Sequence, residues 1–226
     1  MIKYYFLFFF LVTNSFLWAQ SPNFKNYTVE DNLPSSECYQ VLQDKKGFIW
    51  IASDKGVARF DGYKFQNFTK EDGLPENSII RMYEDPYGKI WFAGVTGKIA
   101  YYKNNKITSL KINNELAAKI KGGFVCSMGY SDHALYLGMY YGPGSFRILF
   151  HQNKEKLIMT PIDNKNLGGF VRRLKNGEFI QGWIGRAYKS MDFHHLQNGE
   201  SFTTKNAFSI PAIASNNVRF TLLQNK

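Results

Sequence analysis

The chain has 226 residues, of which 44% are hydrophobic and 17% aromatic, and its net charge is +10. This length is enough to bury a sizeable core in one or two domains, and no long charged or low-complexity run indicates disorder. The lysines are scattered through predicted turns, at Lys45, Lys46, Lys55 and Lys103 among others. Because no helix or stripe gathers them, the charge does not predict a nucleic-acid partner.

The first 19 residues have the layout of a secretory signal peptide. Lys3 precedes an apolar segment over residues 4–12, and Leu17 and Ala19 occupy the −3 and −1 positions of a cleavage site. A membrane anchor is the alternative, but a spanning helix needs about 20 apolar residues, and Thr-Asn-Ser interrupts this segment early. We therefore predict a signal peptide over residues 1–19 and an exported mature chain that begins near Gln20.

Two stretches of the chain, 41 residues apart, carry the same residue types at matched places. The matched pairs are Leu33-Pro34 with Leu74-Pro75, Asp44 with Asp85, Gly47 with Gly88, Ile49-Trp50 with Ile90-Trp91, Ala52 with Ala93, and Gly56 with Gly97. Two fainter units follow after 45 and 44 residues: Leu135-Tyr136 take the places of Ile90-Trp91, and Gly177 and Phe179 those of Gly88 and Ile90. Such self-similarity indicates a repeat architecture.

One repeat unit predicts four short strands joined by tight turns. Aspartate at the start of a turn and glycine at a left-handed position mark the turn Asp44–Gly47, and two further hairpin turns are predicted at Ser53–Gly56 and Asp61–Gly62. The β-branched and aromatic runs between them predict strands over Tyr39–Gln43, Phe48–Ala52, Val57–Phe60 and Tyr63–Phe68. Four strands in about forty residues are typical of a propeller blade.

The predicted fold is therefore all-β: a β-propeller of about four four-stranded blades plus the start of a fifth, which makes residues 20–226 an incomplete propeller. The blades are expected near residues 28–68, 69–107, 120–150 and 165–196. The fifth is expected from 213, where Leu223-Gln224-Asn225 lies over Leu42-Gln43-Asp44 of the first unit.

The repeated tryptophans and aspartates are interpreted as scaffold. Trp50 and Trp91 are expected to fill the wedge between adjacent blades, and Asp44 and Asp85 to accept backbone N–H bonds in their turns. The alternative is a pair of catalytic carboxylates that act on a sugar. The two aspartates, however, occupy one place in successive blades and so lie about a blade apart. Their spacing to the next glycine, with two residues between, also differs from the Asp-box of sialidase-like glycosidases.

Cysteine and histidine predict no catalytic or metal chemistry. Cys38 and Cys126 fall in the first and third units, too far apart for a disulfide, whose Cα atoms lie within about 7 Å. We expect two mostly buried thiols without a disulfide between them. The four histidines, none of which has a partner at metal-ligand or catalytic spacing, are His133, His151, His194 and His195.

The stretch "DNLPSSECYQVLQDKKGFIWIASDKGVARFDGYKF" resembles the two-component regulator propeller repeat of bacterial sensor proteins. The matching residues are Leu33-Pro34, Gln43-Asp44, Gly47-Phe48-Ile49-Trp50-Ile51, Gly56-Val57 and Arg59-Phe60-Asp61-Gly62. The chain departs from the pattern at Asn32, where the family favours Gly, although Gly73 restores it in the second unit. The second unit also lacks the Asp-Gly ending. The resemblance covers residues 28–107.

The resemblance implies an exported, periplasmic sensing region of a two-component signalling protein, with no chemistry of its own. In such proteins further blades, an immunoglobulin-like domain, a membrane helix and a histidine kinase or regulator output usually follow, and this chain lacks them. Some relatives sense carbohydrates, so carbohydrate or another small ligand is the expected partner, and a full-length form is expected to be a homodimer. No catalytic, cofactor, metal or ligand-binding residue carries over.

Two other functions stay open from the sequence. A secreted propeller enzyme acting on polysaccharide would need a convergent cluster of carboxylates, Tyr and His at one end of the propeller. A surface scaffold that binds another protein would need exposed aromatic residues, for which Tyr140-Tyr141 are candidates. The alternative for these tyrosines is burial in a blade core.

Overall fold

The computed structural model of the chain describes residues 24–120, 122–131, 133–140, 144–152, 154–161, 166–173, 179–185, 190–197 and 200–209. The predicted signal peptide, the predicted start of a fifth blade, Tyr141 and Gly177 lie outside these residues.

The first two repeat units form two separate antiparallel sheets of four strands each, in sequential order. The first sheet, blade 1, contains β1 (Cys38–Gln43), β2 (Ile49–Ser53), β3 (Gly56–Phe60) and β4 (Phe65–Phe68). Blade 2 contains β5 (Ile79–Glu84), β6 (Ile90–Gly94), β7 (Ile99–Lys103) and β8 (Lys106–Ser109). The strands that turn chemistry predicted in the first unit are thus present, within two residues of the expected ends.

The third and fourth units are two further four-stranded meanders. Blade 3 contains β9 (Phe124–Ser131), β10 (Ala134–Tyr140), β11 (Gly144–His151) and β12 (Lys154–Pro161). Blade 4 contains β13 (Asn166–Arg173), β14 (Phe179–Gly185), β15 (Ser190–Gln197) and β16 (Glu200–Ser209). A pairing of Tyr140 with Gly168 joins them into one eight-stranded sheet. The strands of both blades are longer than in blades 1 and 2, so these units run past residues 150 and 196.

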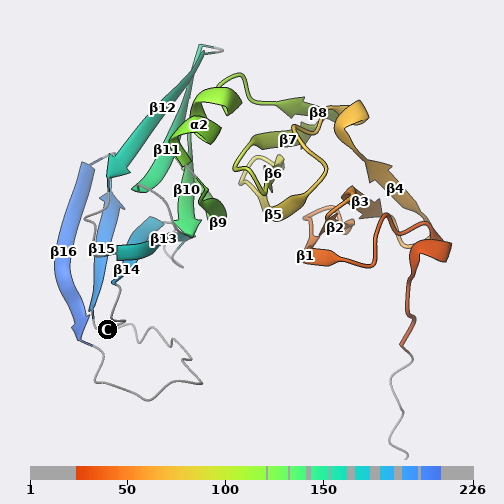
Figure 1. Cartoon of the computed structure of the whole chain (residues 1–226), viewed down its shortest axis with the longest axis horizontal. Helices are drawn as coiled ribbons and strands as arrows, with labels where there is room; N and C mark the ends of the chain where they lie inside the picture. The colour runs from red at the N-terminus through yellow and green to blue at the C-terminus, as the bar shows by residue number, and fades with distance from the viewer. Residues whose placement is uncertain are drawn as a thin grey trace, which may run out of the picture.

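The four blades follow one another along an arc, as in a propeller (Figure 1). The first strand of each blade, β1, β5, β9 and β13, lies toward the concave side, and neighbouring first strands contact each other. The last strands β4, β8, β12 and β16 lie toward the convex side (Figure 1). This radial order is the consequence of short hairpins, which keep sequential strands adjacent.

Left-handed backbone at a fixed place ends the first turn of each of the first three blades. Gly47 has φ 90°, Gly88 has φ 75°, and His133 has φ 57° at the corresponding turn of blade 3. Asn32, where the sequence departs from the repeat pattern, has φ 71°, and Gly73 at the matched place has φ 108°. Asparagine tolerates this conformation better than most residues, so the substitution preserves the turn.

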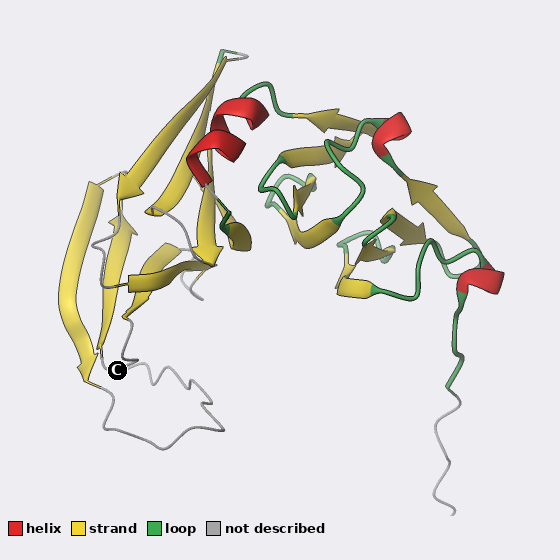
Figure 2. Ribbon diagram, in the orientation of Figure 1, coloured by secondary structure: helices red, strands yellow, loops and turns green. Residues whose placement is uncertain are grey.

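Short helices on the convex side precede blade 1 and link blades 1, 2 and 3 (Figure 2). The matched 3₁₀ turns Val29–Asp31 and Lys70–Asp72 each begin with a Thr–Asp capping box. A longer helix, α2 (Asn113–Ile120), lies between blades 2 and 3. It buries Leu116 and Ile120 in the core that the two blades share. Its eight residues were not expected from the sequence.

The described core consists mainly of two clusters, each between neighbouring blades. One lies between blades 1 and 2 and is centred on Trp50 and Phe92; the other lies between blades 2 and 3 and is centred on Trp91 and Leu135. The opposite face of blade 1 has no neighbouring blade among the described residues. Val41 there is 62% exposed, whereas Met82, at the matched place in blade 2, is 4% exposed.

The cysteines correct one expectation. No disulfide joins Cys38 and Cys126, as predicted. Cys38 is exposed and Cys126 half-buried, so the prediction that both are mostly buried is wrong. Cys38 begins β1, and the face of blade 1 that turns away from blade 2 has no neighbouring blade among the described residues. Burial raises the pKa of both thiols, and at Cys126 the Sγ also donates to the carbonyl of Gly138 at 3.4 Å.

Candidate functional site

The repeated aspartate, glycine and tryptophan form one hydrogen-bonded unit in blades 1 and 2. Asp44 Oδ1 accepts the backbone N–H groups of Lys46 (2.9 Å) and Phe48 (3.0 Å), and Oδ2 accepts Trp50 Nε1 at 2.8 Å. One carboxylate therefore both stabilises the turn and orients the indole ring. The sequence predicted the backbone bonds but not the bond to tryptophan.

Blade 2 repeats this arrangement atom by atom. Asp85 Oδ1 accepts the N–H groups of Tyr87 (2.8 Å) and Lys89 (2.9 Å), and Oδ2 accepts Trp91 Nε1 at 3.0 Å. Both carboxylates are buried and each accepts three hydrogen bonds. Both oxygens of each carboxylate accept hydrogen bonds from the same blade, so the geometry does not support the catalytic alternative for this pair.

Both tryptophans fill the wedge between blades, as predicted. Trp50 and Trp91 are fully buried. The Trp50 ring lies 5.8 Å from that of Phe92 and 4.9 Å from that of Tyr102, both on blade 2. Trp91 reaches blade 3, where its ring stacks on that of Tyr130 at 5.9 Å.

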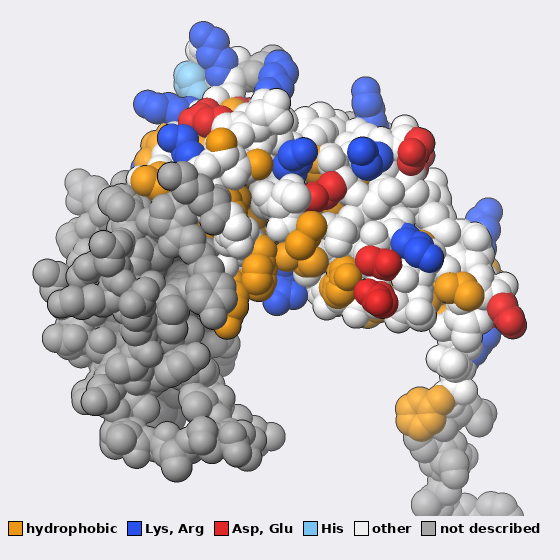
Figure 3. Space-filling view, in the orientation of Figure 1, with side chains coloured by type: hydrophobic (Ala, Val, Ile, Leu, Met, Phe, Trp, Pro, Cys, Tyr) orange, Lys and Arg blue, Asp and Glu red, His pale blue; other side chains and the backbone are white. Residues whose placement is uncertain are grey.

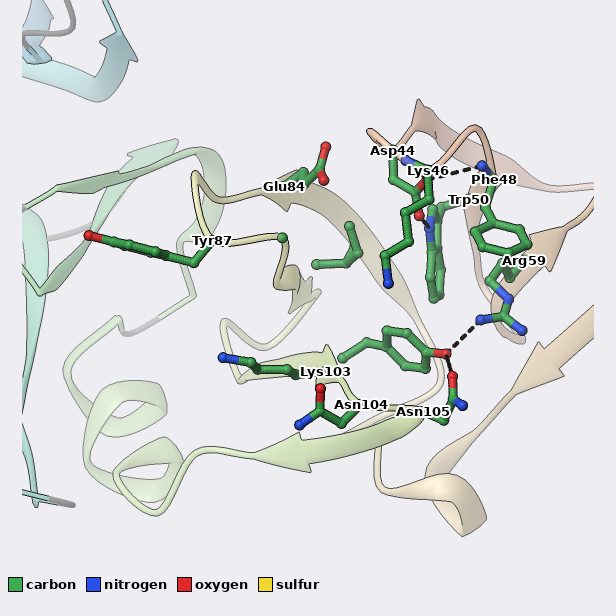
Figure 4. A pocket seen from close by; sticks show the side chains of 13 residues that line it. Asp44, Lys46, Phe48, Trp50, Arg59, Glu84, Tyr87, Lys103, Asn104 and Asn105 are labelled. Carbon is green, nitrogen blue, oxygen red and sulfur yellow. Dashed lines mark hydrogen bonds between the residues drawn. The ribbon is translucent and has the colours of Figure 1, made fainter.

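A groove of about 380 Å³ opens beside Trp50, between blades 1 and 2. Figure 4 shows its walls, which come from the β1–β2 turn of blade 1 and from the β5–β6 and β7–β8 turns of blade 2. The lining residues are Asp44, Lys46, Phe48, Trp50, Arg59, Glu84, Tyr87, Gly88, Ile90, Tyr102, Lys103, Asn104 and Asn105. The groove thus combines aromatic rings, cations and amides at one end of the sheets.

Arg59 is held rigidly at one wall of the groove. Its guanidinium lies over the ring of Phe48 at 4.6 Å, and its Nη1 donates to the hydroxyl of Tyr102 at 2.6 Å. Nη2 donates to Gln66 Oε1 at 2.6 Å. The Tyr102 hydroxyl in turn donates to Asn105 Oδ1 at 2.7 Å, which links both blades in one chain of hydrogen bonds (Figure 4).

The same place between blades 2 and 3 is filled by aromatic rings. Cross-strand pairing puts Tyr130 opposite Leu135 in blade 3, as Glu84 lies opposite Ile90 in blade 2. Ile148 pairs with Leu135 as Tyr102 pairs with Ile90. Phe150 and Asn104, each two residues further along the chain, therefore occupy matching positions. The groove therefore exists where two rings of the next interface are replaced by a carboxylate and an amide.

A cation also lies among rings at the second interface, but it comes from the β5–β6 turn, directly before β6. Lys89 Nζ lies 4.5 Å from the ring of Tyr101 and 5.3 Å from that of Trp91. Burial lowers the pKa of Lys89, while the Asp85 carboxylate opposes this effect. Burial likewise raises the pKa of Tyr130.

Other residues singled out from the sequence do not gather into a site. Tyr140 is 45% exposed and packs its ring against Phe124 at 5.2 Å. Within the described residues, no three His, Cys, Asp or Glu side chains are grouped as metal ligands. Lys and Arg side chains are spread over several blades in the face that Figure 3 shows. In the part of the chain that the structure describes, no helix has the length and apolar character to cross a membrane.

Solved structures similar to this chain include bacterial extracellular and surface proteins. Two structures of the extracellular domain of BT4673 from B. thetaiotaomicron, described as a hybrid two component system and as a one component system, align with TM-scores of 0.54 and 0.53 at 19% and 20% identity. Each alignment covers 80% of this chain and 23% of that domain. PorZ, a surface component of the type-IX secretion system of Porphyromonas gingivalis, aligns with a TM-score of 0.50 at 10% identity, over 80% of this chain and 29% of PorZ.

These likenesses establish the propeller fold, and the chain spans less than a third of each of these proteins. No curated protein matches the chain. The sequence match is more specific, since residues 32–55 and 73–96 each match the two-component regulator propeller. These segments contain the two Asp turns and both buried tryptophans. The chain therefore carries two copies of the two-component regulator propeller repeat, which build its first two blades.

Proposed function

We propose that this chain is a ligand-sensing propeller module of a bacterial two-component signal transduction protein, located on the extracytoplasmic side and without catalytic activity. The match of residues 32–55 and 73–96 to the two-component regulator propeller carries the proposal. The extracellular domains of BT4673 lend support through their shared fold. The predicted signal peptide is consistent with export.

The groove between blades 1 and 2 is the site that we assign to ligand binding. It is open, it is lined by side chains from both blades, and each of its two carboxylates accepts at least one hydrogen bond from the protein. Asp44 accepts three hydrogen bonds, and Glu84 Oε2 accepts the backbone N–H of Lys45 at 3.1 Å. A binding role needs only shape and polar contacts, whereas hydrolysis needs an available acid and base.

Deletion of the reading frame in its host tests the signalling function. Wild-type and deletion strains are grown on a panel of polysaccharides, and their transcripts are compared. We expect a set of genes whose induction by one polysaccharide is lost in the deletion strain. An unchanged transcript profile on every polysaccharide would contradict the sensing role.

Incubation of the purified exported chain with the same polysaccharides tests the absence of catalysis. We expect no new reducing ends over the incubation. Release of product, abolished by a substitution in the groove, would instead identify a secreted propeller enzyme.

A further inference from the structure

We infer that residues 24–27 are the outermost strand of a further blade, whose other three strands come from another repeat of the same protein and cover the free face of blade 1. The free face is the face of blade 1 that turns away from blade 2. The inference concerns an interaction surface, and it does not depend on the proposed sensing function.

The 41-residue repeat continues on the N-terminal side of blade 1. Residues 24–34, "FKNYTVEDNLP", match residues 65–75, "FQNFTKEDGLP", with seven identical residues among the eleven. In blade 1, residues 65–68 are β4, the outermost strand of the sheet. Residues 24–27 therefore have the sequence of an outermost strand, although they precede the first strand of blade 1.

The segment that leads into each blade has the same geometry in blades 1 and 2. The two matched 3₁₀ turns end at Asn32 and Gly73, both in the left-handed conformation. Asn32 Nδ2 lies 3.5 Å from the carbonyl oxygen of Phe65 on β4. Gly73 lies against the carbonyl oxygen of Ile107, the matched residue of β8, so closely that a Cβ atom would approach it to 2.9 Å. Both leading segments thus rest on the outermost strand of the blade that they enter.

Tyr27 contacts blade 1 as Phe68 contacts blade 2. The Phe68 ring lies 5.7 Å from that of Tyr102, with an angle of 61° between the ring planes. The Tyr27 ring lies 5.0 Å from that of Phe60, with an angle of 60°. Phe60 and Tyr102 occupy matched places, because each pairs with the residue before a wedge tryptophan. Residues 24–27 therefore lie against blade 1 as the end of β4 lies against blade 2.

The two segments differ in what surrounds them. β4 pairs with β3 along its length, whereas no strand among the described residues pairs with residues 24–27 (Figure 1). Phe65 is 7% exposed, but Phe24 at the matched place is 91% exposed. Phe68 stacks on Trp50 of its own blade at 5.8 Å, while Tyr27 contacts no tryptophan in the part of the chain that the structure describes. An apolar strand that is built for a sheet is thus left without one.

A three-stranded antiparallel unit of the same repeat would complete both the strand and the free face. The edge of its third strand would pair with residues 24–27, as β3 pairs with β4. Its wedge ring would stack on Tyr27 and pack on the free face, where Val41 is 62% exposed. The four described blades each have an outermost strand of their own, so none of them, in this copy or in a second one, supplies the unit. The occupant is therefore a further repeat that lacks a fourth strand.

Hydrogen–deuterium exchange of the protein as its host exports it, followed by mass spectrometry, tests the inference. We expect the amides of residues 25–27 to exchange at least about a hundredfold more slowly than those of an unstructured peptide, as strand pairing requires. Residues 66–68 of β4 are the internal standard for a paired outermost strand. Phe24→Asp should return residues 25–27 to fast exchange and leave residues 66–68 protected, because a charge would replace a ring that the further blade buries.

The matched control is Val29→Asp, which adds the same charge at a residue that is 56% exposed in the neighbouring 3₁₀ turn. It should leave the protection of residues 25–27 unchanged. Fast exchange of these residues in the wild type, beside slow exchange of residues 66–68, would overturn the inference without any variant. Equal loss of protection in both variants would also overturn it, since the turn alone would then hold the segment. Protection that disappears on dilution would assign the pairing to a second copy and would contradict a partner within the same protein.

Discussion

The interfaces on the two sides of blade 2 are built on one plan, yet one is closed and the other is open. Each contains an Asp–Trp hydrogen bond and a cation packed among rings. Between blades 2 and 3, Tyr130 and Phe150 complete the wedge beside Trp91. Between blades 1 and 2, the corresponding places hold polar side chains, and a groove remains.

The difference teaches which residues make the scaffold and which are free to vary. The aspartate, the left-handed turn residue and the tryptophan recur because each depends on the others for its hydrogen bonds and packing. The residues at the mouth of the wedge do not take part in that unit. A propeller repeat can therefore exchange rings for polar groups there, and so create a binding groove, without losing the blade.

The largest expected effect is the loss of a wedge tryptophan. Trp50→Ala and Trp91→Ala should each lower the free energy of unfolding by about 3–5 kcal/mol, because each removes a fully buried ring and leaves a cavity. Chemical denaturation measures the loss. Trp→Phe at the same positions keeps a ring and should cost less. A variant Trp50→Ala as stable as the wild type would show that the open interface does not depend on its tryptophan.

The substitution Tyr130→Glu puts the groove residue into the closed interface. Tyr130 is 6% exposed, so the new carboxylate would be buried at a position that is packed for an aromatic ring. We expect a loss of about 2–4 kcal/mol in the free energy of unfolding. Tyr130→Phe is the control and should change stability little. A stable Tyr130→Glu variant would mean that the closed interface tolerates a groove as readily as the open one.

The Asp–Trp bond is tested by Asp44→Asn and Asp85→Asn. The asparagine amide has a single acceptor oxygen, so either the indole N–H or the two backbone N–H groups lose their partner. Each variant should lose about 1–3 kcal/mol in thermal or chemical unfolding. Asp61→Asn is a matched control, because Asp61 accepts two backbone N–H bonds in an exposed turn and no indole bond. Equal effects at all three positions would assign the stabilisation to the turn alone.

The smallest effect on stability is expected for Glu84→Tyr, which copies the closed interface into the open one. Glu84 is half-buried at the groove, and a ring there should change the free energy of unfolding by less than about 1 kcal/mol. The same ring should occupy the groove and abolish calorimetric binding of fragments of the polysaccharide that induces the host response. Unchanged binding by a folded Glu84→Tyr variant would place the ligand elsewhere.

The sequence predicts the blades well because their information is local. The turns Asp44–Gly47 and Asp85–Gly88 and the runs beside them specify hairpins without reference to the rest of the chain. The helix α2 was missed because its eight residues fall in the longer spacing between the second and third units. Burial of Cys38 was wrongly predicted because an inner strand is covered only when a neighbouring blade lies on it.

The groove could not be predicted because its walls come from three turns that only blade packing brings together. One signal was present in the sequence. Aligned by strand pairing, Glu84 and Asn104 are polar where Tyr130 and Phe150 are aromatic, but that alignment needs the register of β5 with β6 and of β9 with β10. A fixed repeat spacing of 45 residues would match Glu84 with Gly129 instead of Tyr130, because the β9–β10 turn is one residue shorter than the β5–β6 turn.

The Asp–Trp bond spans six residues of sequence, and this has a consequence for how the chain folds. Contacts so close in sequence form early, since little loop entropy opposes them. Each hairpin can thus orient its indole ring before a neighbouring blade arrives. The oriented ring then forms a packing surface for the next blade of the chain. A chain exported from its N-terminus would in this way assemble in steps of one blade, each step serving as the template for the following one.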